Sequence, residues 1–99
     1  MDYKVEFKDS FLDDLELIVR GIAGENAEAA RRLGEMIVEE GEALGFFPER
    51  HPRVRQRLFL RRLIVGRHYK VFYRIRNDTK TVEILRCWDG RRGTEPTID

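Results

Sequence analysis

The spacing of apolar residues changes at the segment 46–52, and this change constrains the fold more than any other feature of the sequence. Between residues 10 and 45, apolar residues recur every three or four positions, which is the period of an amphipathic helix. From residue 57 onward, apolar and polar residues alternate over long stretches, as in strands with one buried face. Pro48 and Pro52 mark the change, because proline lacks an amide donor and restricts the residue before it. We therefore expect helices before this segment and a sheet after it.

The first half is predicted to contain a short strand and two helices. Residues 2–8 alternate between apolar and charged side chains, which indicates a half-buried strand. Ser10 is expected to cap a first helix that runs to about Arg20. Asn26 is expected to cap a second helix whose apolar stripe ends at Gly45. Small residues would let the two helices pack closely as a hairpin, and these are Ala27, Ala30, Gly34 and Gly41.

Three strands are predicted in the second half, over residues 57–65, 68–76 and 81–88. Gly66 and the polar turn 77–80 separate them. In the middle strand, one face carries the apolar residues Tyr69, Val71, Tyr73 and Ile75. The other face carries Lys70, Phe72, Arg74 and Arg76. This strand therefore presents an apolar side to the helices and a mainly basic side away from them.

The order of the elements predicts an α+β fold. An N-terminal strand is followed by a helical hairpin and then by a three-stranded antiparallel meander, with the helices packed on one face of the sheet. A chain of 99 residues has room for one domain, which we expect to span residues 1–99. Within it, the polar segment 91–99 is expected to be a flexible tail.

Charge is distributed unevenly along the chain. Residues 1–49 contain five Lys/Arg and 13 Asp/Glu, a net charge of −8, whereas residues 50–99 contain 14 Lys/Arg and five Asp/Glu, a net charge of +9. A basic layer attracts polyanions or acidic protein segments. The alternative is that the two halves neutralise each other within the fold.

Several classes of site and location are not expected. Cys87 is the one cysteine, so no internal disulfide framework can form, and we expect it to be a packed side chain. His51 and His68 are too far apart in sequence to suggest a metal site, and no metal or cofactor is expected. No apolar stretch is long enough for a membrane span, and the acidic start does not resemble a signal peptide, so a cytoplasmic location without membrane association is expected.

Three segments, in this order, resemble the RelE/ParE toxin superfamily. They are Arg-Arg-Leu-Ile-Val-Gly at 61–66, His-Tyr-Lys-Val-Phe-Tyr-Arg-Ile at 68–75 and Val-Glu-Ile-Leu-Arg-Cys-Trp-Asp-Gly-Arg-Arg at 82–92. The resemblance spans nearly the whole chain and implies the toxin of a type II toxin–antitoxin system, of the kind linked to plasmid stabilization. It also implies a cognate antitoxin protein as partner, in a toxin–antitoxin hetero-oligomer.

Two mechanisms are known for toxins that this chain resembles. The RelE-like branch cleaves messenger RNA at the ribosome, whereas the ParE-like branch poisons DNA gyrase. RNA cleavage requires cations and an acid or base, and the candidate cations here are Lys70, Arg74 and Arg86. However, residues 89–99 contain neither the Tyr nor the His that nucleolytic relatives commonly place near the C-terminus, and His68 is expected to be an ordinary rim residue. The Gly-Arg-rich ending resembles the ParE-like branch, so gyrase is the favoured target, with ribosome and messenger RNA as the alternative.

The candidate binding residues are mostly basic and are expected on the sheet face away from the helices. They are Arg62, Lys70, Arg74, Arg86, Trp88, Arg91 and Arg92. Whether Arg61 or Arg62 faces this surface is left open, because adjacent strand residues point to opposite faces. Trp88 is expected to anchor a partner or to cover the sheet edge. Candidates for an antitoxin groove are Leu12, Val19, Met36, Phe46 and Phe47. Of these, Phe46 and Phe47 are expected to pack in the core instead.

Overall fold

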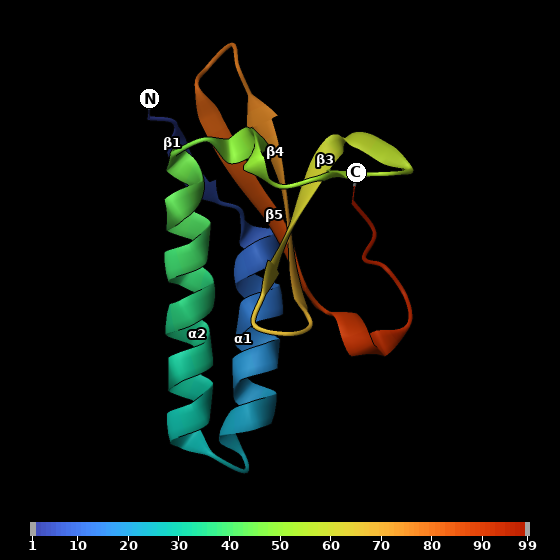
Figure 1. The fold of residues 1–99 in the computed structure, drawn as a ribbon. Coiled ribbons are helices and arrows are strands. Elements are labelled where there is room, and N and C mark those ends of the chain that lie inside the picture. Colours follow the sequence, from blue (N-terminus) through green and yellow to red (C-terminus); the bar gives the residue numbers. More distant parts are fainter. Residues whose placement is uncertain (1, 99) are drawn as a thin grey trace.

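Two helices cover one face of a five-stranded sheet in the computed structural model, which describes residues 2–98 (Figure 1). The helices are α1 (Asp9–Ala23) and α2 (Ala27–Glu42). The strands are β1 (Lys4–Phe7), β2 (Arg53–Val54), β3 (Arg57–Val65), β4 (Tyr69–Arg76) and β5 (Thr81–Asp89). Short 3-10 helices occupy Ala43–Gly45, Pro48–Arg50 and Gly90–Arg92. The predicted α+β fold is confirmed.

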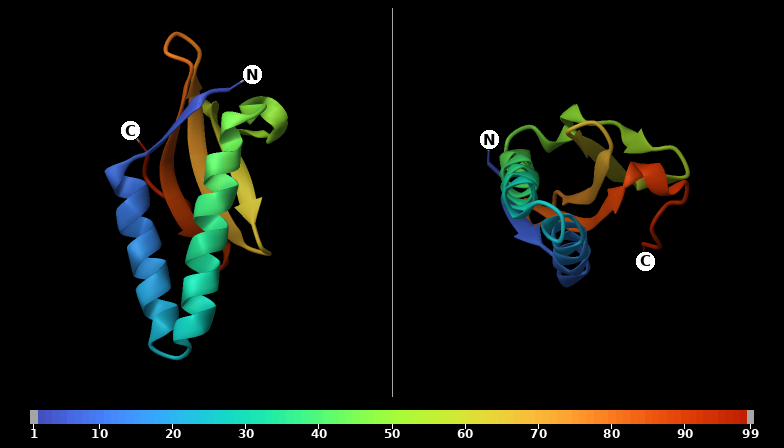
Figure 2. Two further views of the ribbon diagram at one scale, coloured as in Figure 1. Left: turned by 90° about the vertical axis from the view of Figure 1, so that its left-hand side faces the viewer. Right: turned by 90° about the horizontal axis from the view of Figure 1, so that it is seen from below.

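The sheet has the strand order β1-β5-β4-β3-β2. The strands β3, β4 and β5 form the predicted antiparallel meander, and β1 pairs in parallel with β5. The two-residue strand β2 was not predicted, because a pair of residues between Pro52 and a turn carries no alternation to read. Figure 2 shows the two helices side by side in front of the sheet.

The two predicted helix caps have different outcomes. Asn26 caps α2 as expected, since its side chain accepts a hydrogen bond from the Ala29 amide at 3.0 Å. The prediction for Ser10 was wrong: α1 begins at Asp9, and Lys8 stands at its N-cap without a side-chain hydrogen bond. Instead, the Ser10 hydroxyl donates to the Leu85 carbonyl at 2.6 Å. The residue therefore joins α1 to the sheet rather than starting the helix.

The main core lies between the helices and the inner face of the sheet, which is the face that they cover. Phe11, Ile37 and Leu44 come from the helical half and are fully buried. They pack with residues of β3, β4 and β5, namely Leu63, Val65, Tyr69, Val71, Tyr73, Val82, Ile84 and Cys87. The predicted apolar face of β4 is thus confirmed.

A second apolar cluster lies on the outer face of the sheet, which is the face away from the helices. Leu60 and Phe72 are buried there together with Ile98 from the C-terminal segment. Val54, Leu85 and Trp88 pack around these three residues. The segment after β5 passes on this side of the sheet (Figures 1 and 2). The outer face therefore has an apolar centre, whereas the sequence predicted a single aromatic residue, Phe72, among basic ones there.

None of the helices within residues 2–98 has the length and apolar character that a membrane crossing requires.

Candidate binding surface

Strand register determines which predicted residues share the outer face. Residues directly opposite each other on neighbouring strands point to the same side of a sheet. Arg62 lies opposite Phe72, and Phe72 lies opposite Arg86. Lys70 lies opposite Trp88, and Arg74 lies opposite Glu83. Four of the predicted binding residues therefore come together around Phe72, and Arg74 lies farther along β4.

Arg62, rather than Arg61, is the arginine on the outer face. Arg61 lies opposite Tyr73, whose side chain belongs to the inner core. The Arg61 guanidinium donates to the carbonyl oxygens of Glu49 at 3.1 Å and His51 at 2.8 Å. It therefore holds the linker between α2 and β2 against the sheet.

Each of the three candidate nuclease cations already has a carboxylate partner. Lys70 Nζ lies 3.0 Å from Glu95 Oε2, and Arg74 pairs with Glu83. Arg86 donates to both carboxylate oxygens of Asp14, at 2.6 and 2.9 Å. The hydrogen bond from Arg74 lowers the pKa of Glu83, and the bond to Asp14 raises the pKa of Arg86. In this structure, the positive charge of these groups is neutralised within the chain.

The pair of Asp14 and Arg86 also closes an edge of the sheet. The β1 strand pairs with β5 only as far as Ile84, so the following residues of β5 lack a strand partner on that side. Asp14 Oδ2 accepts from the Cys87 amide at 3.0 Å, and Ser10 binds the Leu85 carbonyl. Side chains of α1 thus continue the hydrogen bonding that β1 begins. Burial raises the pKa of the Cys87 thiol to about 12, so the thiol stays protonated at neutral pH.

The C-terminal segment covers much of the outer face. Trp88 Nε1 donates to the Thr94 carbonyl at 2.8 Å, and Arg86 Nη1 donates to the Thr97 carbonyl at 2.7 Å. Arg57 donates to the Ile98 carbonyl. The Ile98 side chain is only 8% exposed, against Leu60 and Phe72. The predicted binding face is therefore occupied by the chain's own segment 94–98.

The last two predicted binding residues, Arg91 and Arg92, lie at different places. The Arg92 guanidinium lies 4.0 Å from the centroid of the Trp88 ring, on the outer face. Arg91 instead bonds Asp89 and lies 6.0 Å from the ring of Tyr69, a residue of the inner core. The hydrogen bond from Arg91 lowers the pKa of Asp89 to about 2. Arg91 therefore does not join the cluster that contains Trp88.

The two histidines each contact a tyrosine ring. The His51 ring makes an edge contact with Tyr73, 6.4 Å between centroids, and burial lowers its pKa. The His68 ring lies 4.8 Å from that of Tyr69. Tyr73 donates to the Pro48 carbonyl at 2.5 Å, and burial raises its pKa to about 12. No group of three or more potential metal ligands occurs within residues 2–98.

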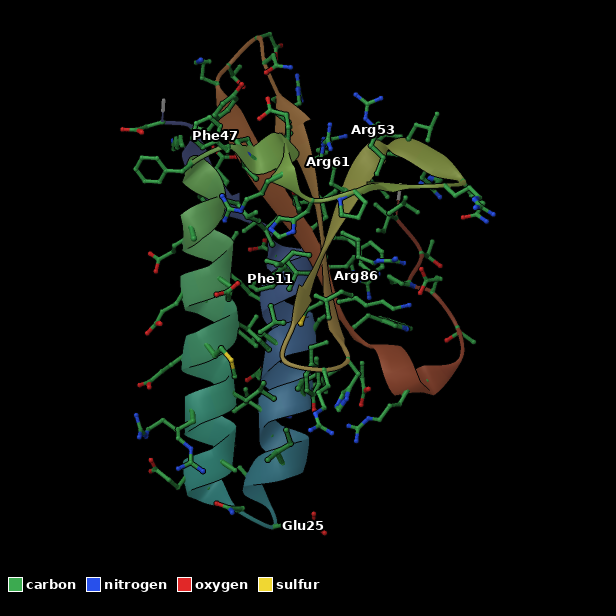
Figure 3. All side chains as sticks on the ribbon, viewed as in Figure 1. Phe11, Glu25, Phe47, Arg53, Arg61 and Arg86 are labelled. Carbon is green, nitrogen blue, oxygen red and sulfur yellow. The ribbon has the colours of Figure 1, made fainter. Side chains whose placement is uncertain are left out.

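The prediction that Phe46 and Phe47 pack in the core was wrong. Their side chains are 57% and 71% exposed, and Pro48 is buried in their place. Phe47 has a φ of 46°, in the left-handed region, and its side chain points away from the body of the molecule (Figure 3). Leu12 and Met36 are also exposed, whereas Val19 packs toward Gly34 of α2. Apolar surface is therefore available to a partner on both helices and at the end of α2.

The predicted residue Arg62 belongs to a cluster of arginines on β2, the following turn and β3, of which Arg53, Arg55 and Arg57 were not predicted. We call residues 53–62 the arginine hairpin; its basic residues are Arg53, Arg55, Arg57, Arg61 and Arg62. Arg53 and Arg61 lie near each other in Figure 3. None of the five forms an ion pair with a carboxylate of residues 2–98. The density of arginine was visible in the sequence, but the lack of carboxylate partners depends on the fold.

Comparison with known proteins identifies the family. The family model of the ParE toxin of the type II toxin–antitoxin system parDE matches residues 5–93. The structure is similar to that of the chromosomal ParDE toxin–antitoxin system from P. aeruginosa, with a TM-score of 0.76 and 20% identity over 88% of this chain and 95% of that chain. It is also similar to the toxin–antitoxin complex RelBE2 from Mycobacterium tuberculosis, with a TM-score of 0.70 and 25% identity over 90% of this chain and 92% of that chain.

A mutant of the E. coli toxin RelE in the free state has the same fold, with a TM-score of 0.67 and 11% identity over 95% of this chain and 88% of that chain. No curated protein sequence matches significantly. The family match covers most of the chain, including the helical hairpin and the meander that carry the surfaces described above. The chain therefore belongs to the family of ParE toxins of type II toxin–antitoxin systems.

Proposed function

We propose that this toxin inhibits growth by binding and poisoning DNA gyrase, without cutting RNA, and that a cognate antitoxin neutralises it. The observation that carries the choice of mechanism is the pairing of the three candidate nuclease cations. Lys70, Arg74 and Arg86 each have a carboxylate partner within the chain. A scissile phosphate would have to compete with these partners for every one of the charges that stabilise its transition state.

The acid–base requirement points in the same direction. Attack by a 2′ oxygen needs a group that accepts its proton and another that protonates the leaving oxygen. Residues 89–99 contain neither Tyr nor His, and Tyr73 and Cys87 are held protonated by burial. Inhibition by binding needs none of these groups, only a surface complementary to the target.

Neutralisation by an antitoxin fits the charge and the exposed apolar groups of the chain. The similar structures from P. aeruginosa and M. tuberculosis are those of a ParDE toxin–antitoxin system and of the toxin–antitoxin complex RelBE2. In this chain, exposed apolar side chains such as Leu12 and Met36 can receive the apolar face of a partner helix. The basic second half attracts an acidic partner over longer distances.

Expression without the antitoxin tests the proposal. The protein is induced in bacterial cells, and transcript cleavage and gyrase-dependent DNA breaks are recorded in the same arrested culture. We expect DNA breaks together with intact transcripts. Purified toxin is then expected to inhibit supercoiling by purified gyrase and to leave a messenger RNA on ribosomes uncut.

The opposite pattern would contradict the proposal. Codon-associated cleavage of transcripts without DNA breaks would identify the outer sheet face as a nuclease site. In that case, Lys70→Ala would abolish cleavage while leaving the far-ultraviolet circular dichroism spectrum unchanged.

A further inference from the structure

The segment 94–98 lies on the outer sheet face and is held there mainly through its backbone. Three side chains of the sheet donate hydrogen bonds to its carbonyl oxygens, and these bonds are Trp88 to Thr94, Arg86 to Thr97 and Arg57 to Ile98. One ion pair, between Lys70 and Glu95, adds a contact through a side chain. Backbone carbonyls are acceptors that any extended chain offers, and many polar side chains offer similar oxygens. The acceptors that the segment supplies can therefore be replaced by those of another molecule.

The segment has few contacts that would hold it in place. Ile98 is buried and Pro96 is partly buried, whereas Thr94, Glu95 and Thr97 are exposed. Residues 95–98 have no regular secondary structure, and Gly93, with a φ of 75°, turns the chain just before the segment. Ordering these residues costs conformational entropy, and the burial of one large side chain offsets only part of that cost. The segment can therefore leave the sheet without disturbing the strands beneath it.

The segment does not fill the surface that it covers. A cavity of about 270 Å³ is lined by Pro96 and Ile98 of the segment and by Leu60 and Phe72 of the sheet. Arg62 lies opposite Phe72 on the same face, and its Nε is buried without a hydrogen bond within residues 2–98. An unpaired buried donor is costly, so a ligand that supplies an acceptor there would gain free energy that the segment does not. The outer face is therefore a larger binding surface than its own segment uses.

Release of the segment would expose groups that are typical of binding hot spots. Leu60 and Phe72 would lose the cover of Ile98, and the indole N–H of Trp88 would lose its acceptor. Lys70 would lose its carboxylate partner and carry a charge that is no longer neutralised. Aromatic side chains at the centre of a desolvated patch contribute much of the binding energy in protein interfaces. The outer face thus has the composition of a protein-binding surface, and the segment covers its centre.

We propose that the segment 94–98 is a releasable cover that limits the access of the toxin's target to the outer sheet face. In the closed form the segment occupies the apolar centre, and in the open form the same surface binds gyrase. The inference rests on the proposed function, because it takes gyrase as the ligand, and it adds the surface used and its regulation. The apparent affinity of a ligand that binds only the open form is lowered in proportion to the fraction of molecules in that form. Variants that favour the open form are therefore expected to be stronger inhibitors than wild type.

Two full-length variants release the segment through different contacts. Ile98→Asp places a charge against Leu60 and Phe72. Glu95→Lys replaces the ion pair with Lys70 by a repulsion. In a supercoiling assay with purified gyrase, each variant is expected to reach half-inhibition at a concentration at least ~3-fold below that of wild type. The two substitutions change the net charge in opposite directions, so an effect that they share cannot arise from net charge.

Two control variants leave the segment in place. Glu25→Lys changes the charge by the same amount as Glu95→Lys, and Glu25 is exposed at the connection between α1 and α2, away from the segment (Figure 3). Thr97→Ala keeps the carbonyl that Arg86 binds. Both controls are expected to inhibit gyrase within about twofold of wild type. Circular dichroism and the melting temperature confirm that each variant is folded.

The fluorescence of Trp88 reports the release of the segment without gyrase. Both release variants are expected to shift the emission to longer wavelength, because the indole loses the Thr94 carbonyl and becomes more exposed to water. Lys70→Glu/Glu95→Lys restores the ion pair with its signs exchanged, and we expect it to return the emission towards that of wild type. Emission that is unchanged in both release variants would overturn the inference, since the segment would then not depend on these contacts.

The inhibition assay separates a failure of this inference from a failure of the proposed function. If wild type inhibits gyrase and both release variants, with shifted emission, inhibit it equally well, gyrase does not bind the outer face. Weaker inhibition by both folded release variants would mean that the segment itself contacts gyrase rather than covering the site. Either result overturns the inference and leaves the gyrase mechanism valid. A wild-type protein that cleaves transcripts and does not inhibit gyrase would contradict the proposed function, and the inference with it.

Discussion

At the scale of single residues, some charged side chains that could bind a partner instead make contacts within the fold. Arg86 was a candidate site residue, yet its guanidinium binds Asp14 of α1 and the Thr97 carbonyl. Asp14 was one of many acidic residues, yet it joins the helix to Arg86 and to the amide of Cys87. At this scale, the partner of a side chain determines whether it is available for function.

Removing Asp14 should destabilise the fold more than removing an exposed acidic residue. Asp14→Ala leaves Arg86 without its carboxylate and the Cys87 amide without an acceptor, and both groups are partly buried. We expect a loss of about 1–3 kcal/mol in the free energy of unfolding, measured with urea. Glu16→Ala, which breaks the exposed pair with Arg20 on α1, serves as the control and should have at most a few tenths of a kcal/mol of effect.

The pair of Arg74 and Glu83 should make stability depend on pH. Arg74 lowers the pKa of Glu83 below its ordinary value of 4.5, so the folded state favours the charged carboxylate. The resulting stabilisation is fully present above pH 4.5 and is lost as the pH falls through the lower pKa of the folded state.

Melting temperatures of wild type and Glu83→Gln measure this effect. We expect the difference between them to be largest above pH 5 and to shrink as the pH is lowered, as the linkage argument requires. A difference that stays constant over the whole pH range would mean that the charge of Glu83 is not involved.

At the scale of elements, local sequence pattern and close packing act together. The helix α2 approaches the sheet closely because Gly41 carries no side chain. A Cβ at this position would lie 2.9 Å from Phe7 Cε1 and 3.0 Å from Ile84 Cδ1. Helix propensity alone would favour alanine here, so packing is the reason that glycine is needed.

Two glycine substitutions should therefore have opposite effects. Gly41→Ala is expected to destabilise the protein, because the new methyl group displaces the ring of Phe7 and the side chain of Ile84. Gly21→Ala has no atom within 4 Å of its Cβ, and it should stabilise the protein by up to about 1 kcal/mol. Chemical denaturation of the two variants and of wild type measures the change in the free energy of unfolding that each substitution causes. Stabilisation by Gly41→Ala would contradict the packing argument.

The whole molecule keeps its two halves electrically distinct. Two of the eleven ion pairs within residues 2–98, those of Lys8 with Glu83 and Asp14 with Arg86, join the acidic half to the basic half. Mutual neutralisation of the halves therefore does not account for the uneven charge. The surface remains acidic on the helices and basic on the arginine hairpin, and such a molecule orients an acidic partner as it approaches.

The C-terminal segment contacts the outer face of the sheet through Trp88, Arg86 and the apolar cluster around Phe72. Its release should therefore change both the stability and the fluorescence of the protein. Ile98→Asp places a charge between Leu60 and Phe72, and we expect it to detach the segment and lower stability by about 1–2 kcal/mol. Trp88 is the one tryptophan, and its indole donates to Thr94, so its fluorescence should shift to longer wavelength. Thr97→Ala, which keeps the backbone carbonyl that Arg86 binds, is the control. An unshifted emission of Ile98→Asp would contradict the packing described here.

The order and type of the main elements could be predicted from the sequence, because the periods of helices and strands arise from consecutive residues. The sequence also determined the Asn26 cap, the buried face of β4 and the family. That Arg62 rather than Arg61 lies on the outer face could not be predicted, because it depends on the register between β3 and β4. The tertiary structure likewise decided that Asp14 meets Arg86 across 72 positions and that Phe47 is exposed. Contacts between residues that are distant in sequence produce no periodic pattern. Which basic side chains pair with a carboxylate is therefore known only from the folded structure.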